Sequence, residues 1–363
     1  MSDTKINSSI SSDVMDRAEL ERKSREIYEH KTNIQYEKFK EQERRYEKTQ
    51  QIDLTETSEE VVNKLRRENI DYQEQAKNSK VFINNSFKGM VPYFARNLIL
   101  IAGVSGHGKS TTSANLGYHA YVQDQKILMI VNEEHPTDVY NRITCLGKGW
   151  AYVDHSSFTE EQIKAFDEGI VSLSKKIYVA HDSMNGEPGQ TTTFEGIKRI
   201  LDEALRVQDT HPYDVIIIDY YQNISQSLEG ERRPWEVQEN FVRYIDNFKL
   251  NYNAPIILLA QLRPGDESKL PFKEAIEGRK SILNVATCAI KIEAERDLAR
   301  TSFEFKKCRF NDSVGKTVYT GFSKGKYIPY TDEFKNNTEL NKERKTQAEL
   351  LKRIKVTNGL ESE

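Results

Sequence analysis

The segment Gly103–Ser110 reads GVSGHGKS and matches the pattern GxxxxGK[ST] at every defined position. It follows the apolar run Asn97–Ala102 and precedes a stretch with helical character, so a strand, a glycine-rich turn and a helix are expected in succession. Glycines let such a turn fold tightly and aim its N–H groups inward, and the following helix adds the positive end of its dipole. The sequence therefore predicts a phosphate-binding loop inside an α/β core.

This loop predicts a site for ATP and Mg²⁺. Lys109 is expected to place a point charge on the β- and γ-phosphates, and the Ser110 hydroxyl is expected to ligate Mg²⁺. The candidate nucleotide-binding residues are Gly103, Ser105, Gly106, His107, Gly108, Lys109, Ser110 and Thr111.

Apolar strand-like runs alternate with amphipathic stretches through the middle of the chain. The runs are continuously apolar, as expected for parallel strands that are covered on both faces, and the alternation predicts a doubly wound α/β sheet. After Ala286 shorter strand-like pieces follow, which we interpret as an antiparallel extension of the same sheet. The expected strands are Asn97–Ala102, Ile127–Asn132, Lys176–Ala180, Val215–Asp219 and Pro255–Gln261, and the expected helices are Ser110–Gln123, Thr137–Leu146, Thr159–Leu173, Phe194–Arg206 and Pro234–Asn251.

Both ends of the chain are polar. Residues 31–50 are half charged, which favours a solvated helix, with an arm that packs on a neighbouring subunit as the functional alternative. A second helix is expected over Ser58–Ala76, and the tail from Asn337 to Lys355 is also charged and helix-prone. The predicted organisation is a helical arm over residues 1–80, an α/β domain over 81–330 and a helical tail over 331–363.

The composition excludes several classes of protein. With 53 Lys and Arg against 56 Asp and Glu, the net charge of -3 argues against a uniformly basic nucleic-acid binder but allows a local basic channel. The apolar runs are too short for a membrane span or a signal peptide. Three scattered cysteines, Cys145, Cys288 and Cys308, give no disulfide framework and no CxxC site, so a reduced, cytoplasmic location is expected.

Polar residues follow three of the expected strands. Asp219 ends the run VIIID, which is the expected form of a Walker B carboxylate that reaches Mg²⁺. Glu133 and Glu134 follow the strand that starts at Ile127, and we expect Glu134 first, and Glu133 second, to act as the general base. The alternative is that both only begin the next helix as favourable charges. Gln261 ends a further strand, where its amide could sense the γ-phosphate.

Four segments together resemble the DnaB-like replicative helicases of the RecA fold, including those of T4-type phages. The resemblance covers roughly residues 80–330 and implies a RecA-like ATPase motor domain. The segments that carry it are NEEHP at Asn132–Pro136, DYYQ at Asp219–Gln222, AQLR at Ala260–Arg263 and KCR at Lys307–Arg309.

The resemblance implies a role for each of these motifs. Asp219 takes the Walker B position, Glu134 that of the catalytic glutamate, and Gln261 that of the γ-phosphate sensor. Lys307 and Arg309 match a pair that reaches into the nucleotide site of the next subunit. The two lie two apart on an expected strand, so their side chains face the same way, and a residue supplied by a neighbour predicts a closed ring, which the resemblance implies to be hexameric.

The resemblance also implies partners. A translocating helicase holds single-stranded DNA through backbone contacts, and primase, a helicase loader or other replisome proteins are the expected protein partners. No membrane contact is expected, and the location is the host cytoplasm if the chain is phage-encoded. Two polar segments follow the expected strands, either as channel-facing loops or as ordinary solvated loops. The candidate DNA-binding residues are Arg232, Arg233, Arg263, Lys269, Lys273, Arg279 and Lys280.

Two other functions share this fold. A filament-forming, strand-exchanging recombinase would also place a Glu-His pair where Glu134 and His135 stand. A regulatory ATPase of the same fold would hydrolyse ATP without moving along DNA. The fold alone does not separate these functions from a helicase.

Overall fold

The computed structural model describes residues 58–152, 157–182, 191–224, 233–263 and 270–336, together with Thr338. The chain divides into two units, Met1–Ile70 and Asp71–Glu363. Of the first unit, only the beginning of helix α2 (Ser58–Lys77) is described, which confirms the helix expected there. The sheet and the candidate site lie in the second unit. The helix expected over residues 31–50 and nearly all of the expected C-terminal tail lie outside the described residues.

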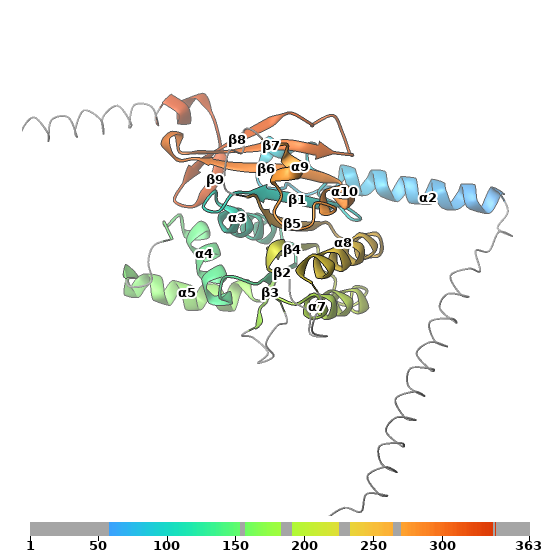
Figure 1. Cartoon of the computed structure of the whole chain (residues 1–363). Coiled ribbons are helices and arrows are strands. Elements are labelled where there is room, and N and C mark those ends of the chain that lie inside the picture. Colours follow the sequence, from blue (N-terminus) through green and yellow to red (C-terminus); the bar gives the residue numbers. More distant parts are fainter. Residues whose placement is uncertain are drawn as a thin grey trace, which may run out of the picture. The chain divides into compact units, whose positions relative to one another are not determined.

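A nine-stranded sheet organises the described part of the second unit (Figure 1). Its strand order is β3-β2-β4-β5-β1-β6-β7-β8-β9. All pairings from β3 to β6 are parallel, and those from β6 to β9 are antiparallel. The strands are β1 (Leu98–Gly103), β2 (Ile127–Val131), β3 (Ile177–Ala180), β4 (Val215–Asp219), β5 (Ile256–Gln261), β6 (Cys288–Glu295), β7 (Arg300–Cys308), β8 (Thr317–Ser323) and β9 (Lys326–Pro329).

The helices begin where the sequence supplies capping residues. Thr159 and Gln162 form a reciprocal capping box at the start of α5, and Pro234 occupies the first turn of α8. The α-helices after α2 are α3 (Lys109–Val122), α4 (Pro136–Lys148), α5 (Glu160–Leu173), α7 (Phe194–Arg206), α8 (Pro234–Asn251), α9 (Phe272–Ala275) and α10 (Ile282–Val285). Short 3-10 turns are η1 (Asn85–Phe87), η3 (Tyr221–Asn223) and η4 (Arg296–Leu298).

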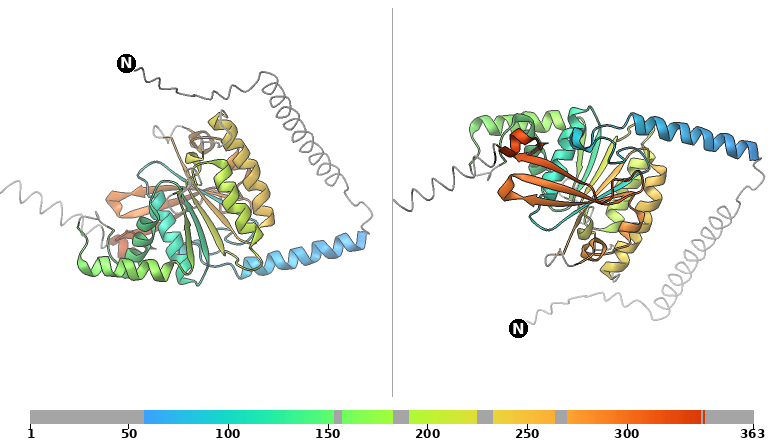
Figure 2. Two further views of the ribbon diagram at one scale, coloured as in Figure 1. Left: turned by 90° about the horizontal axis from the view of Figure 1, so that it is seen from below. Right: turned by 90° about the horizontal axis from the view of Figure 1, so that it is seen from above.

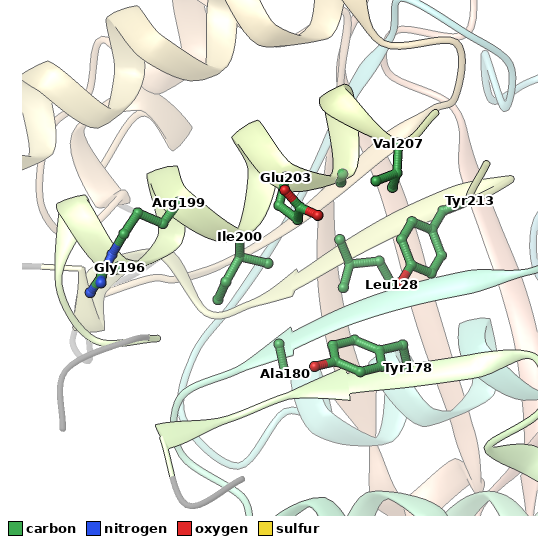
Figure 3. A pocket seen from close by; sticks show the side chains of 10 residues that line it. Leu128, Tyr178, Ala180, Gly196, Arg199, Ile200, Glu203, Val207 and Tyr213 are labelled. Carbon is green, nitrogen blue, oxygen red and sulfur yellow. The ribbon is translucent and has the colours of Figure 1, made fainter. Parts of the chain in front are cut away.

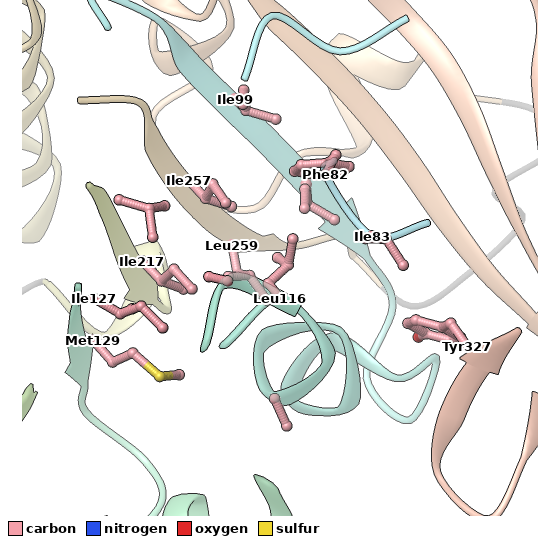
Figure 4. Packing of buried hydrophobic residues seen from close by; sticks show 14 of the residues in the cluster. Phe82, Ile83, Ile99, Leu116, Ile127, Met129, Ile217, Ile257, Leu259 and Tyr327 are labelled. Carbon is pink, nitrogen blue, oxygen red and sulfur yellow. The ribbon is translucent and has the colours of Figure 1, made fainter. Parts of the chain in front are cut away.

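Helices cover both faces of the parallel part of the sheet (Figure 2). Alternate side chains of β1 enter two separate cores, because successive residues of a strand point to opposite faces. Ile99 and Ile101 pack in the core that contains residues of α3 and α4, whereas Leu98 and Leu100 pack in the core that contains residues of α7 and α8. Figure 4 shows the first core, in which Leu116 of α3 lies over the sheet. The predicted RecA-like, mostly parallel sheet is confirmed.

One detail of the predicted extension is wrong. The sequence interpretation made all of the late strands antiparallel, but β6 pairs parallel with β1, with Ile99 opposite Cys288 and Ala102 opposite Lys291. The reason is the long connection from β5, which passes through α9 and α10 and returns the chain to the amino end of β1 before β6 begins. From β7 on, each strand runs antiparallel to the one before it.

Candidate nucleotide site at the carboxyl edge of the sheet

The glycine-rich loop leaves β1 at Gly103 and ends at the first turn of α3. Gly106 and Gly108 have φ values of 80° and 89°, in the left-handed region that glycine adopts without strain. Gly108 is the N-cap of α3 and supplies no side-chain hydrogen bond, so no N-cap side chain satisfies the amides of the first helical turn. Such a helix start suits an anion, and phosphate is the anion that the loop sequence predicts.

Lys109 is buried directly behind this loop. Its Nζ donates to the carbonyl oxygens of Gly103 and Val104, at 3.2 and 3.3 Å. Burial lowers the pKa of Lys109, while the carboxylates of Asp219 and Glu133 act in the opposite direction. The ammonium group is therefore held by neutral carbonyls, and its charge remains available to a phosphate.

Asp219 stands at the end of β4, beside the end of β2, where it pairs with Val131. The carboxyl group is buried, and burial together with the nearby Glu134 raises its pKa to about 7. A carboxylate that is costly to ionise alone is stabilised by a cation, so Asp219 fits a role beside Mg²⁺. Among the described residues no group of three His, Cys, Asp or Glu side chains could hold a metal.

The two glutamates after β2 differ in their surroundings. Glu134 is half-buried, lies beside Ser110 and accepts a 2.8 Å hydrogen bond from Nη2 of Arg142 on α4. Burial raises the pKa of Glu134, and the Arg142 guanidinium opposes that rise. Glu133 is exposed. The contact with Ser110 brings Glu134, rather than its neighbour, to the predicted metal ligand.

Gln261 ends β5 on the other side of the loop. Its backbone pairs with Gly103, and the N–H of the next residue, Leu262, donates to the Gly103 carbonyl at 3.0 Å. The structure therefore brings the ends of β1, β2, β4 and β5 together at one edge of the sheet. Lys109, Ser110, Glu134, Asp219 and Gln261 all lie at this edge.

Two cavities open beside the loop. One, of about 640 Å³, is lined by Ser105 and His107 together with residues 293–298, and the other, of about 430 Å³, is lined by His107, Thr111 and Tyr327, among others. Nη2 of Arg296, in η4, donates to the Gly106 carbonyl at 3.1 Å and so joins the β6–β7 connection to the loop. A further hollow of about 300 Å³ lies between β2, β3 and α7 (Figure 3), and none of the predicted nucleotide-binding residues lines it.

Lys307 and Arg309 lie at the opposite end of the parallel strands, where these strands begin. The Arg309 N–H donates to the Thr287 carbonyl, and the Thr287 N–H donates to the carbonyl of Leu98, the first residue of β1. Gly103 lies five residues further along that strand, a distance of roughly 17 Å at about 3.3 Å per residue. Both side chains point the same way, as predicted, because each donates to the Asn284 carbonyl. Neither can reach the phosphate loop of its own chain.

The predicted DNA-binding cations are partly covered by acidic partners. Arg279 pairs with Glu239 at 3.0 Å, and Lys280 pairs with Glu274. Of the remaining predicted residues, Arg263, Lys273 and Arg233 are described, and Arg233 is exposed at the start of α8. Arg232 and Lys269 lie outside the described residues.

Two contacts of the site were missed by the sequence interpretation. Arg142 lies eight residues after Glu134, and Arg296 follows the loop by nearly two hundred positions. The helix expected over residues 137–146 begins just after Glu134 and contains Arg142. The sequence could therefore have suggested that Arg142 lies near Glu134. Arg296 gave no such signal, because its contact depends on how the β6–β7 hairpin lies against the loop.

Comparison with known proteins gives one family and one fold. The family description "DnaB-like helicase C terminal domain" matches residues 82–274, which is more than half of the chain. The structure is similar to a solved protein described as an ATPase domain, with a TM-score of 0.59 and 14% identity, over 76% of this chain and 99% of that one. It is also similar to a solved DnaB-like replicative helicase whose interactions with primase were described, with a TM-score of 0.56 and 13% identity, over 76% of this chain and 67% of that one. No curated protein matches the sequence. At these identities the structural likeness concerns the fold alone.

Proposed function

This chain belongs to the DnaB-like helicase family, and from that membership we propose that it is a replicative DNA helicase. In this proposal a hexameric ring of the chain hydrolyses ATP, moves along single-stranded DNA and unwinds duplex DNA. The coarser statement, that the chain is a helicase of an ATP-hydrolysing family, follows from the family itself. No described helix is long and apolar enough to cross a membrane.

One observation carries the proposal of a ring. The phosphate loop lies at the carboxyl end of β1. Lys307 and Arg309 lie level with the amino end of this strand, roughly 17 Å away along it. If these cations act on a nucleotide, that nucleotide must be bound by another copy of the chain. Each copy then offers a loop at one end of the strands and an arginine at the other, which is a head-to-tail arrangement, and in this proposal it closes into a ring rather than extending into a filament.

The residues at the carboxyl edge divide the chemistry among themselves in this proposal. Lys109 and the amides of the loop hold the phosphates, while Ser110 and Asp219 hold Mg²⁺, which would neutralise charge on the β- and γ-phosphates. Glu134 orients and deprotonates the attacking water, and Arg142 keeps its carboxylate in place.

Two further groups respond to the γ-phosphate in the same proposal. Gln261 lies beside the loop through its pairing with Gly103, so a change at the phosphate can reach β5. Arg309 of the next copy stabilises the charge that develops as the phosphoryl group leaves, and Lys307 assists it.

Single-stranded DNA is the proposed track. Arg233, Arg263, Lys273, Arg279 and Lys280 are the described candidates for contacts to its phosphates. The ion pairs of Arg279 and Lys280 weaken their charge, so we assign them contacts that form when DNA displaces Glu239 and Glu274. Primase, a loader and other replisome proteins are the proposed protein partners, because the DnaB-like relative was described with primase. We propose that the protein works in the cytoplasm, of a host if it is phage-encoded.

The proposal is tested by ATP hydrolysis and strand separation with the full chain. We expect single-stranded DNA to stimulate hydrolysis, a forked duplex to be unwound, and a ring to form with a non-hydrolysable ATP analogue. Hydrolysis without any stimulation by DNA would instead favour a regulatory ATPase. Long filaments on DNA in electron micrographs, in place of rings, would favour a recombinase.

A further inference from the structure

Strand β5 extends beyond its neighbour β4. The last paired residues of the two strands are Ile218 and Leu258, whereas β5 continues to Gln261. After Asp219 the chain leaves the sheet and turns through η3. Gln261 therefore has no partner in β4, although Gly103 of β1 pairs with it on the other side and the Glu277 N–H donates to its carbonyl at 3.0 Å.

The side-chain amide of Gln222 takes the place of that missing strand. Its Oε1 accepts a hydrogen bond from the Gln261 N–H at 2.8 Å, and its Nε2 donates to the Gln261 carbonyl at 3.1 Å. The same Nε2 donates to the Glu277 carbonyl at 2.7 Å. The amide thus reinforces the backbone hydrogen bond from the Glu277 N–H to the Gln261 carbonyl, at 3.0 Å, and together they join the predicted γ-phosphate sensor to the segment that leads to Arg279 and Lys280.

The segment Glu277–Arg279 is fixed from the same side by other residues. The hydroxyl of Tyr221, which is fully buried in η3, donates to the Arg279 carbonyl at 3.2 Å. Oε1 of Gln238 on α8 accepts from the Arg279 N–H at 3.1 Å. Gly278, which stands between Glu277 and Arg279 in the chain, has a φ of +83°. A Cβ at this position would lie 2.8 Å from Gln238 Oε1. The segment is therefore packed onto η3 and α8.

We propose that Gln222 is a positioning residue that couples the nucleotide site at Gln261 to the cationic pair Arg279 and Lys280. The inference rests on the proposed function, because it takes Gln261 as a sensor and the two cations as DNA contacts. A shift of the Gln261 backbone on phosphate contact moves the amide that also holds Glu277. By the reciprocity of linked equilibria, DNA that pulls on the cations acts back on Gln261.

The test compares Gln222→Met, which keeps the length of the side chain but removes its hydrogen bonds, with Gln208→Met as a matched control. Gln208 donates only a long hydrogen bond, of 3.5 Å, to the Asn251 carbonyl. ATP turnover is measured with and without saturating oligothymidylate, and affinity for a labelled oligothymidylate is measured with and without a non-hydrolysable ATP analogue.

We expect Gln222→Met to keep its unstimulated turnover and to lose stimulation by DNA about tenfold, within the range of typical coupling energies. We also expect the ATP analogue to change the affinity of Gln222→Met for the oligonucleotide much less than it changes that of the wild type. Gln208→Met should behave as the wild type in both measurements.

Normal stimulation in Gln222→Met would overturn the inference, and so would an equal fall of stimulated and unstimulated turnover. If Gln222→Met does not fold, Gln222→Glu is judged by the same criteria, since it keeps an acceptor for the Gln261 N–H and loses both donated hydrogen bonds. A wild-type protein that DNA does not stimulate would refute the proposed function, which is a different result.

Discussion

At the scale of the residue, the Lys109 ammonium is the buried positive charge that stands behind the phosphate loop. It is held by two neutral carbonyls, so no acidic partner neutralises it there, and its removal takes a positive charge from behind the loop. We expect Lys109→Ala to abolish ATP binding or to reduce turnover below detection, as measured by nucleotide titration and phosphate release. Lys126→Ala, at an exposed lysine before β2, is the matched control. Normal turnover in Lys109→Ala would refute the site.

The two glutamates after β2 allow a sharper test. Glu134 contacts Ser110 and Arg142, whereas Glu133 is exposed. We expect Glu134→Gln to bind ATP normally and to lose about 10²- to 10⁴-fold in turnover, the usual effect of removing a general base. Glu133→Gln should lose much less. If Glu133→Gln shows the larger loss instead, the assignment of the base is reversed.

The placement of the main site residues could be predicted from the sequence, but their contacts could not. Asp219, Glu134 and Gln261 each follow an apolar strand, and parallel strands end at a common edge. The hydrogen bonds of Gln222 to Gln261, 39 positions away, replace a strand pairing that ends only because η3 turns out of the sheet. No local pattern encodes that geometry.

At the scale of the element, α3 contains a histidine whose protonation opposes folding. His119 is largely buried, its Nε2 has no hydrogen-bond partner among the described groups, and burial and Lys326 lower its pKa to about 4. An unfolded histidine has a pKa near 6.5, so below that pH the unfolded chain takes up a proton that the folded chain does not. Stability that is present above pH 6.5 is lost as the pH falls towards 4, by up to about 1.4 kcal/mol per pH unit.

We therefore expect His119→Gln to lose less stability than the wild type as the pH is lowered through this window. The measurement is urea unfolding above pH 6.5 and again between pH 6.5 and 4. His211→Gln, at an exposed histidine, is the control and should follow the wild type. Equal pH dependence in all three proteins would contradict the role given to His119.

The strands and helices of the parallel part were predicted to within one or two residues, because their apolar runs are separated by clear capping and turn signals. The direction of β6 was not, since a strand carries no sequence mark of its orientation. Its direction is set by the connection through α9 and α10.

At the scale of the whole molecule, each copy carries two parts of the proposed active sites, and these parts lie at opposite ends of the parallel strands. The phosphate loop lies at the carboxyl edge of β1, and Arg309 lies level with the amino end of that strand. We expect Arg309→Ala to bind ATP but to lose about 10³- to 10⁵-fold in DNA-stimulated turnover, the usual contribution of an arginine supplied by a neighbour. Full DNA-stimulated hydrolysis in this variant would remove Arg309 from the reaction.

The central claim, that two copies share each site, is tested most directly by mixing two inactive variants. Lys109→Ala keeps a sound Arg309, and Arg309→Ala keeps a sound phosphate loop. A random equal mixture should recover roughly a quarter of the wild-type turnover, because one interface in four then pairs a sound loop with a sound arginine. Lys109→Ala mixed with the double variant should stay inactive. A mixture of the two single variants that remains inactive, although both are shown to assemble together, would contradict the account.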